Sequence, residues 1–498
     1  MNSLYRRLCF LSVLLLTVCG VGAQTLSLDD CRKLALQNNK QLSVARLKQE
    51  VAKDAKGVAK AQYLPKVDAL GSYVHTTKEI SLLNDKQKAT FNSLGTTTYN
   101  SLATNLPSIA AELVGSGLIT PEQAVALGDL FNKYGEGLKN GLDGLGQKVT
   151  DAFRTDTRNI WVGSIVVSQP IYMGGRLTAM NKIADISQDL AANETASQEQ
   201  TVLINTDRAY WLVVSLRHKK ALAQQYYDLV KTLEDDVDKM VKSGVATKAN
   251  KLSVSVKVNE ADMTLTQVDD GLALSKMALC QICGLPIDSK IVLTDENASS
   301  FDVVPAVPTY PEDMAINNRP EIKMLENANA IAEQGVKLAR AGYLPTVAMT
   351  AGWTISNPNI FNGYQKKFGD VFDIGVVFRM PLWNWGETKY KIRTAKAATS
   401  ISALELADVK DLVRLQVNQN EFKLNEANKK LIMTNKNIKS AEENLRAATL
   451  GFKEGVMTSS NVLEAQTAWL VAHTQQIDAA IDVKLAQTEL KKTLGILR

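Results

Sequence analysis

The chain contains an internal duplication, and this restricts its fold more than any other feature of the sequence. Segment 61–67 (AQYLPKV) recurs as 341–347 (AGYLPTV), and segment 169–175 (QPIYMGG) recurs as 380–386 (MPLWNWG). The second offset, 211 residues, also relates 242–247 (KSGVAT) to 453–458 (KEGVMT). Repeated segments of this kind indicate repeated supersecondary units. Each copy reads as helix, strand, strand, long helix, tight turn and helix.

Alternating runs predict two strands in each copy, at 67–74 and 161–169 and at 347–354 and 372–380. One face of these strands is apolar and ends in aromatic residues, as in membrane barrel strands, so we expect it to contact lipid. The expected lipid-facing residues are Tyr73, Trp161, Ile165, Val167, Trp353, Phe372, Ile374, Val376 and Phe378. The opposite face carries Asp373 and Arg379, which suits a water-filled lumen. Strands of a soluble sandwich alternate similarly, so alternation alone does not decide between them.

The long helices are the most informative elements. No proline occurs from Arg176 to about Val241 or from Glu387 to Lys453, and roughly 66 helical residues would span roughly 100 Å. Such lengths indicate coiled coils. The helices expected after the turns, 248–283 and 459–495, and before the strands, 28–62 with Ser27 as N-cap and 309–342, are about half as long. Two short helices stacked end to end would match one long helix.

Four strands per chain cannot close a membrane barrel, because the smallest known barrels have eight strands. No apolar stretch after the N-terminal segment is long enough for a membrane helix, so membrane insertion requires a closed barrel. Insertion therefore requires oligomerisation. Two subunits would supply eight strands, and three would supply twelve strands with twelve helical columns.

Prolines and glycines mark the junctions between elements. The expected strand–helix junctions are Pro65, Pro170, Gly174, Gly175, Pro345, Pro381 and Gly386. Gly174 and Gly175 predict a sharp turn rather than a phosphate loop, because no lysine follows with the required spacing. At the turns between long and return helices, Lys242 and Lys453 suit helix C-termini.

The same turns carry one glycine and one threonine each. Gly244 and Gly455 suit the left-handed position after a helix. Thr247 and Thr458 are expected to N-cap the helices that follow. These features predict a tight helical hairpin in both copies.

Residues 1–23 are expected to be a secretory signal, with Arg6 and Arg7 before an apolar run and Val21-Gly22-Ala23 before the cleavage site. A membrane anchor is the less favoured alternative, because the apolar run is short. Lipidation of Cys19 is a second alternative, although Val18 is a poor residue before a lipidated cysteine.

The expected organisation is a first repeat at 24–284, a linker at 285–308 and a second repeat at 309–498. An insertion at 76–159 has no counterpart in the second copy, where the loop is about 356–370. It contains an expected helix from Pro121 to Lys133. We expect an extracellular cap, since barrels place long loops outside the cell. A plug within the lumen is the alternative.

Catalytic and nucleic-acid-binding functions are not indicated. The formal net charge is +5 and falls on removal of two arginines with the signal, which is too weak to imply nucleic acid. The histidines are isolated in sequence, at His75, His218 and His473, and their spacing predicts no zinc site. No nucleophile elbow or paired carboxylates occur. We therefore expect no enzyme activity, no metal and no cofactor.

Three cysteines remain after the signal, at Cys31, Cys280 and Cys283. Cys280 and Cys283 have redox-motif spacing but lack the strand-turn-helix context of such motifs. Their favoured interpretation is as small apolar helix residues. A structural disulfide in an oxidising compartment is the alternative.

These motifs, in their order within a duplicated unit, resemble the TolC-like outer-membrane efflux family over nearly all of the mature chain except 76–159. The resemblance implies an α+β fold. A trimer would combine a transmembrane β-barrel of four strands per subunit with a long antiparallel α-helical coiled-coil barrel crossing the periplasm of a Gram-negative bacterium. It implies a passive exit duct for efflux, including multidrug resistance, or type I secretion. The implied partners are a periplasmic adaptor and an inner-membrane RND or ABC transporter.

The resemblance also assigns the hairpin tips to adaptor contact and gating. The residues implied are Gly244, Thr247, Asn250, Gly455, Thr458, Asn461 and Glu464. In the family an acidic pair lines the last tip, and Asn461 replaces one of its acids, so a weaker acidic ring is expected. Asn250 and Ser253 are the uncharged equivalents in the first copy. A surface adhesin acting through 76–159 and a periplasmic coiled-coil adaptor that never inserts remain alternatives.

Overall fold

The computed structural model describes residues 24–77, 83–92, 137–153, 158–297, 310–362 and 365–497, with a few isolated positions between 116 and 125. The expected signal segment and most of the expected helix at 121–133 lie outside the described residues. The chain forms two compact units. The helical unit comprises Met1–Lys60, Arg176–Gly342 and Trp383–Arg498, and the sheet unit comprises Ala61–Gly175 and Tyr343–Leu382.

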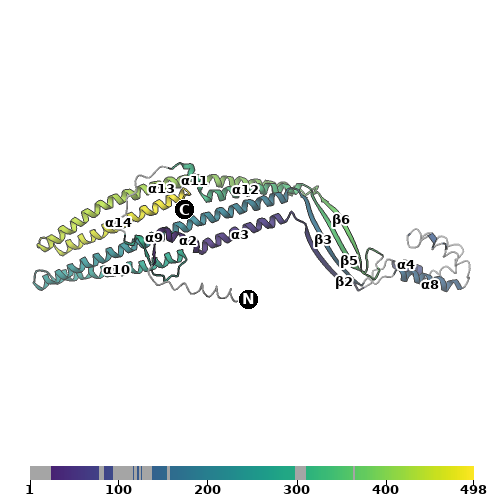
Figure 1. Cartoon of the computed structure of the whole chain (residues 1–498), viewed down its shortest axis with the longest axis horizontal. Coiled ribbons are helices and arrows are strands. Elements are labelled where there is room, and N and C mark those ends of the chain that lie inside the picture. The colour runs from purple at the N-terminus through teal and green to yellow at the C-terminus, as the bar shows by residue number, and fades with distance from the viewer. Residues whose placement is uncertain are drawn as a thin grey trace, which may run out of the picture. The chain divides into compact units, whose positions relative to one another are not determined.

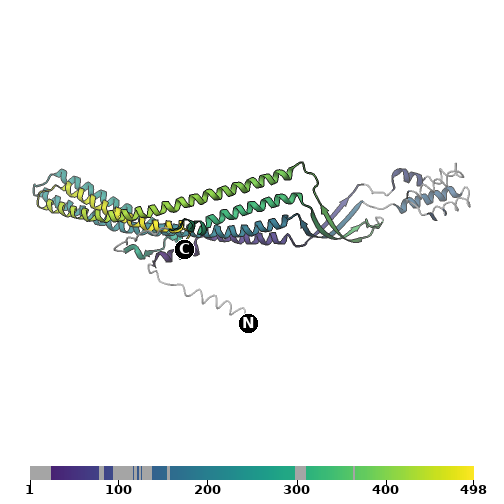
Figure 2. The same ribbon diagram turned by 90° about the horizontal axis from the view of Figure 1, so that it is seen from above.

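Two long helical hairpins dominate the helical unit. Helix α9 (Arg176–Lys242) returns through α10 (Lys248–Cys283), and α13 (Glu387–Lys453) returns through α14 (Ser459–Thr493). Each long helix has 67 residues, about 100 Å at 1.5 Å per residue. The predicted long helices and their return helices are confirmed. Figures 1 and 2 show the two hairpins side by side along their length.

The predicted single helices 28–62 and 309–342 are wrong, because each is broken once. Helix α2 (Leu28–Asn38) is followed by α3 (Lys40–Ala61), and α11 (Glu312–Asn318) is followed by α12 (Pro320–Arg340). The residues at the breaks, Asn39 and Arg319, are extended, with ψ near 124° and 126°. The two residues occupy equivalent positions in the two copies, because they are separated by 280 residues, the same offset that relates 61–67 to 341–347.

The two breaks have different local causes. Asn39 caps α3 with its side-chain oxygen, which accepts hydrogen bonds from the backbone N–H groups of Gln41 and Leu42 at 2.9 and 3.2 Å. Arg319 precedes Pro320, and a residue before proline is restricted to extended backbone. The predicted N-cap at Ser27 is confirmed, and it forms a capping box with Asp30.

A small parallel sheet closes the first copy. Strand β1 (Gln24–Leu26) pairs with β4 (Ile291–Leu293), which leads into the short 3-10 helix η1 (Thr294–Asn297). Leu26, Ile291 and Leu293 are buried with residues of α2, α9 and α10. Strands of three residues are too short for alternation to reveal, so the expected linker contained unpredicted structure.

The sheet unit contains four antiparallel strands in the order β2-β3-β5-β6. They are β2 (Lys66–His75), β3 (Asn159–Met173), β5 (Thr346–Asn357) and β6 (Gly369–Arg379). The first copy supplies β2 and β3, and the second supplies β5 and β6. A 3-10 helix, η2 (Ala341–Tyr343), precedes β5.

Part of the insertion between β2 and β3 is described. Helix α4 (Asp85–Asn92) packs on α8 (Gly137–Ala152). Thr150 donates a hydrogen bond to the side-chain oxygen of Asn92 at 3.0 Å. Among the helices that the structure describes, none combines the length and the apolar character needed to cross a membrane.

Candidate functional site

The tip between α9 and α10 is a compact turn closed by backbone hydrogen bonds. The N–H groups of Val245 and Ala246 donate to the carbonyl of Met240 at 2.9 and 3.2 Å. Gly244 has φ 79°, which completes a Schellman-type helix end. Thr247 accepts a hydrogen bond from the Asn250 N–H at 3.3 Å and thereby caps α10.

The tip between α13 and α14 has the same construction. The N–H groups of Val456 and Met457 donate to the Gly451 carbonyl at 2.8 and 3.0 Å, and Gly455 has φ 74°. Thr458 caps α14 through a capping box, with the Asn461 N–H donating to its hydroxyl at 3.4 Å. The left-handed glycines and threonine caps predicted from the sequence are confirmed in both copies.

The outer surface of both tips is exposed and partly apolar. Val245 is 72% exposed and its equivalent Val456 is 82% exposed. Asn250, Asn461 and Glu464 are also exposed. The structure therefore presents every residue predicted for gating on the tips or in the first two turns of the helices that follow them.

An apolar core supports the tips from within. Buried residues of α9, α10, α13 and α14 form one cluster, which includes Val237, Val254, Phe452 and Val462. On α9, Asp238 binds Lys242 and also Lys251 of α10, at 2.6 and 2.5 Å. Hydrogen bonds from these two lysines lower the pKa of Asp238 to about 2. The ion pairs therefore connect both sides of the first tip.

Polar contacts connect the two hairpins below the tips. Gln466 of α14 donates to the carbonyl of Leu229 on α9 at 3.1 Å, and Lys219 of α9 pairs with Asp478 of α14 at 2.6 Å. Within the second hairpin, His473 lies 3.3 Å from Glu442. Burial lowers the pKa of His473, although Glu442 opposes the shift.

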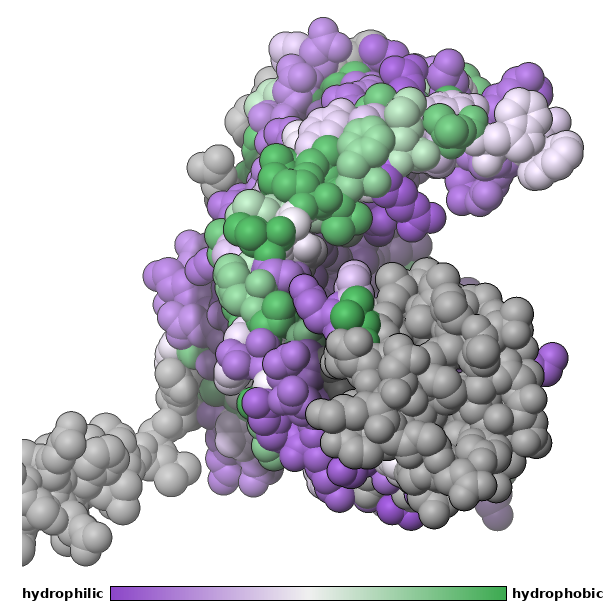
Figure 3. Space-filling view, turned by 90° about the vertical axis from the view of Figure 1, so that its right-hand side faces the viewer, coloured by the Kyte–Doolittle hydropathy of each residue, from purple (hydrophilic) through white to green (hydrophobic). Residues whose placement is uncertain are grey.

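The register of the four strands places the predicted lipid-facing residues on one face of the sheet. Tyr73 pairs with Trp161, and Trp353 pairs with both Ile165 and Phe372. Members of this face on β6 are more than 60% exposed, namely Phe372, Ile374, Val376 and Phe378. Figure 3 shows hydrophobic residues gathered in a continuous area of the surface, with hydrophilic residues beside it. The sheet is thus amphipathic, with an apolar face left uncovered in the described chain.

The opposite face is mixed, with Asp68, Asp373, Arg379 and several hydroxyl side chains beside apolar residues such as Leu70 and Val377. Asp373 pairs with Gly352, and a side chain at Gly352 would meet the Asp373 carboxylate at 2.8 Å. Arg379 occupies the same face six residues further along β6. The outer strands β2 and β6 each pair on one side only, so the sheet has two open edges in the described chain.

The predicted junction residues lie at or near the strand ends. Pro65 directly precedes β2 and Pro345 precedes β5, whereas Pro170 lies within β3 at a register shift. Gly174 and Gly175, at φ 61° and 78°, connect β3 to α9. Their equivalents are Trp385 and Gly386, at φ 51° and 79°, after Pro381 and before α13.

Trp385 is therefore a tryptophan in a conformation that favours glycine. It is 87% exposed and stacks edge-to-face on Trp383 with ring centroids 5.8 Å apart. The duplication makes position 385 equivalent to Gly174, but the sequence did not reveal that the tryptophan has a positive φ.

A buried ion pair was missed by sequence analysis. Asp207 of α9 is fully buried, and Arg32 of α2 donates to both of its carboxylate oxygens at 2.7 and 2.6 Å. Thr488 of α14 donates to the same carboxylate at 2.9 Å. The signal in the sequence was a single acidic residue, Asp207, within the largely apolar segment 202–214. The pair lies between two helices of the first copy, and the hydrogen bond from Thr488 connects it to the second copy.

Within the described ranges, no group of three or more histidine, cysteine or acidic side chains could hold a metal ion. What the geometry provides is an amphipathic sheet with open edges and two capped hairpin tips.

Known proteins share this architecture. A crystal structure of CusC, described in terms of folding and transmembrane channel formation, superposes with a TM-score of 0.70 at 14% identity, covering 96% of this chain and 95% of that one. The likeness shows that the two chains share a fold over nearly their whole length.

Sequence comparisons agree with the fold. The alkaline protease secretion protein AprF of Pseudomonas aeruginosa is 22% identical to this chain. The match covers 71% of this chain and 75% of AprF. The outer membrane efflux protein BepC of Brucella suis is 24% identical over 68% of this chain and 73% of its own. The family model for outer membrane efflux proteins matches residues 140–285 and 313–496, more than half of the chain. The chain belongs to the outer membrane efflux protein family.

Proposed function

We propose that three copies of this chain form a passive exit channel across the outer membrane and the periplasm. Each copy would supply four strands to a twelve-stranded barrel, above the minimum of eight that a closed barrel needs. The observation that carries the proposal is the four-stranded sheet, which has an exposed apolar face, an opposite face that carries Asp373 and Arg379, and two open edges. In lipid, open edges must be paired, so neighbouring copies would pair β2 with β6.

The helices form the periplasmic part of the duct. Residues 1–23 direct export, the repeats at 24–284 and 309–498 build the channel, and the insertion at 76–159 lies outside the cell. The energy for transport comes from an inner-membrane transporter of the RND or ABC class. The names of AprF and BepC support this, since one refers to protein secretion and the other to efflux.

The hairpin tips contact a periplasmic adaptor and gate the duct. Gly244 and Gly455 fix the turns, and Thr247 and Thr458 fix the first turns of the return helices. Asn250, Asn461 and Glu464 line the mouth. The exposed valines Val245 and Val456 offer the adaptor the same apolar contact in both copies, giving six similar contacts around a trimer.

Single-channel conductance of the detergent-purified oligomer, measured in planar bilayers together with its mass, tests this function. We expect a mass of three chains and discrete conductance steps. A trimer that inserts but stays silent would indicate a closed mouth. A monomer without membrane activity would refute the barrel and favour a periplasmic coiled-coil protein.

A further inference from the structure

Three buried cysteines lie where the first copy begins and ends. Cys31 is in the first turns of α2, and Cys280 and Cys283 are in the last turn of α10. All three are fully buried, in a cluster with Tyr210, Leu279 and other apolar residues. Cys31 and Cys283 thus come from opposite ends of the repeat but share one core.

All three cysteines are free thiols in the structure, and the thiol of Cys283 packs against Cys31. The sulfur of Cys283 lies 3.6 Å from the carbonyl oxygen of Cys31. A hydrogen bond between the two side chains raises the pKa of Cys31 and lowers that of Cys283. The sulfur of Cys280 is directed elsewhere, 3.9 Å from the carbonyl oxygen of Ser289.

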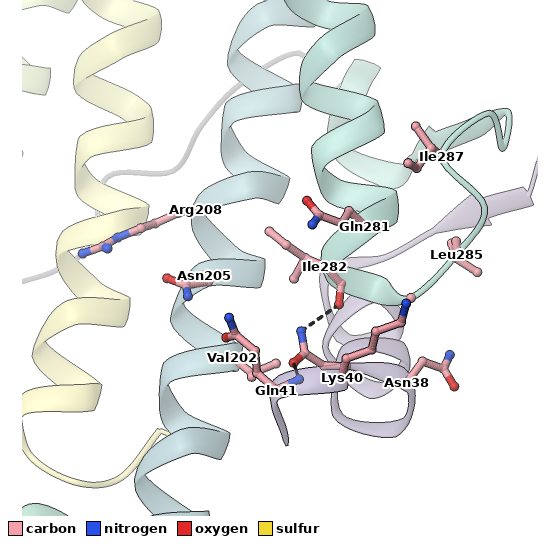
Figure 4. Close-up of a pocket in the computed structure, with 12 residues that line it drawn as sticks. Asn38, Lys40, Gln41, Val202, Asn205, Arg208, Gln281, Ile282, Leu285 and Ile287 are labelled. Carbon is pink, nitrogen blue, oxygen red and sulfur yellow. Dashed lines mark hydrogen bonds between the residues drawn. The ribbon is translucent and has the colours of Figure 1, made fainter. Parts of the chain in front are cut away.

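Independent bonds hold the two helices in this position. The side-chain amide of Asn38 donates to the Cys283 carbonyl at 3.4 Å, and that of Asn39 donates to the Ile282 carbonyl at 3.3 Å. The second bond is drawn in Figure 4, beside a cavity of about 640 Å³. A Cβ at Gly284 would lie 2.4 Å from the Asn38 Cβ, so the backbones are closely packed. The two cysteines therefore remain adjacent whether or not their sulfurs are bonded.

We propose that Cys31 and Cys283 form a disulfide as the exported chain folds, while Cys280 stays a free thiol. The inference rests on the proposed export to the periplasm, where disulfides form and persist. The oxidant is the disulfide of a periplasmic thiol oxidoreductase. One cysteine thiolate attacks that disulfide to give a mixed disulfide, and the second displaces the oxidoreductase sulfur. The chain loses two electrons and two protons, and the oxidant leaves as a dithiol.

The contacts favour this pair over Cys280 with Cys283. Both of those residues are on one helix, and their sulfurs approach different carbonyl groups. The cross-link belongs to the first copy alone, because Pro311 and Leu494 occupy the equivalent positions in the second. It would join the two ends of the first repeat and enclose β2, the insertion, β3, α9 and α10.

Alkylation of protein from an acid-quenched cell envelope tests the proposal. The protein is unfolded with and without reductant and labelled at its thiols, and the label is counted by intact mass. We expect one labelled thiol without reductant and three with it, and a peptide map that joins Cys31 to Cys283. Three labelled thiols without reductant, or a peptide joining Cys280 to Cys283, would overturn the proposal.

Matched variants assign the bond. Cys31→Ser should leave two labelled thiols in unreduced protein, whereas the control Cys280→Ser should leave none. Fractionation of the same cells separates this proposal from the channel function. Three free thiols in outer-membrane protein would refute only the disulfide, and absence from the outer membrane would contradict the channel. Three free thiols refute the disulfide in any fraction.

Discussion

Met240 and Ala246 in the first tip are equivalent to Gly451 and Met457 in the second. In the first tip the Ala246 N–H donates to the carbonyl of Met240, and in the second the Met457 N–H donates to that of Gly451. A Cβ at Gly451 would lie 2.9 Å from the Met457 side chain, so the larger residue in the turn requires a glycine in the helix. The large and small residues have exchanged places while the turn has stayed the same. At residue scale, the copies preserve packing rather than identity.

Replacing Asp207 by asparagine should destabilise the helical unit strongly. The variant leaves the Arg32 guanidinium, whose side chain is 19% exposed, without its buried counter-charge. Breaking a buried pair in this way costs about 3–5 kcal/mol. Unfolding of the purified protein by denaturant, in detergent, measures the loss.

Arg208 of α9 and Glu489 of α14 provide a matched control at the neighbouring position of α9. They pair at 2.8 Å, but their side chains are 53% and 30% exposed. Glu489→Gln should cost about 1 kcal/mol or less. Equal losses in the two variants would show that burial does not set the importance of the Asp207 pair.

Replacing Gly284 by alanine should destabilise the end of the first copy. Gly284 has φ 70°, which costs an alanine about 1–2 kcal/mol, and the added Cβ would also collide with Asn38. The control is Gly335→Ala in α12, where a Cβ meets nothing within 4 Å and should stabilise by about 0.4–1 kcal/mol. Thermal unfolding of both variants measures the difference, and a neutral Gly284→Ala would refute the close packing.

His473 should make the bundle below the tips less stable as the pH falls. Burial lowers its pKa below the ordinary value of 6.5, so the unfolded chain binds the proton first. Protonation then favours unfolding, and stability falls as the pH decreases from 6.5 through the folded pKa. His473→Gln should weaken this dependence, whereas wild-type and variant should respond alike to pH if the histidine is not involved. Unfolding midpoints at pH 7.5 and 5 measure it.

At the scale of elements, periodicity predicted the helices better than their interruptions. Runs without proline defined α9 and α13 almost to the residue, because no proline interrupts either stretch of 67 residues. The break at Asn39 depends on one side chain that caps α3 and also binds α10. A single asparagine within a helical pattern does not reveal such a tertiary contact. Strands β1 and β4 escaped prediction for a similar reason, since each is stable only against the core.

The second tip should tolerate little change in its turn. Proline at position 455 cannot adopt φ 74°, and it removes the N–H that donates to Phe452 at 3.1 Å. Gly455→Pro should therefore impair efflux while the protein still reaches the outer membrane. Drug sensitivity and membrane fractionation of the same strain measure the two effects. Unchanged sensitivity would contradict a gating role for this tip.

At the scale of the whole molecule, the strand count predicted oligomerisation, and the register now explains the apolar face. Alternation assigned residues such as Trp161 and Phe372 to one side, and pairing through β5 places them on the same face. The buried pair of Arg32 and Asp207 could not be predicted. Its partners are 175 positions apart, and no local pattern links them. Sequence thus predicted the surfaces better than the contacts between distant helices.

The insertion should be dispensable for channel formation. The ladder of β2 and β3 extends to His75 and Asn159, and the Thr76 N–H donates to the Arg158 carbonyl at 2.8 Å. A short turn replacing residues 78–157 should therefore leave trimer mass and conductance unchanged. Loss of surface adhesion with conductance retained would add a second role for the insertion. Loss of the trimer would contradict the placement of this segment outside the barrel.

The open edges of the sheet have a consequence for biogenesis. A newly exported chain carries two rows of unpaired backbone groups, on β2 and β6, beside an uncovered apolar face. Such edges are templates for pairing with the wrong chain. If copies of the chain pair these edges as proposed, we expect the monomer to need periplasmic chaperones and to be a target for proteases until the copies meet.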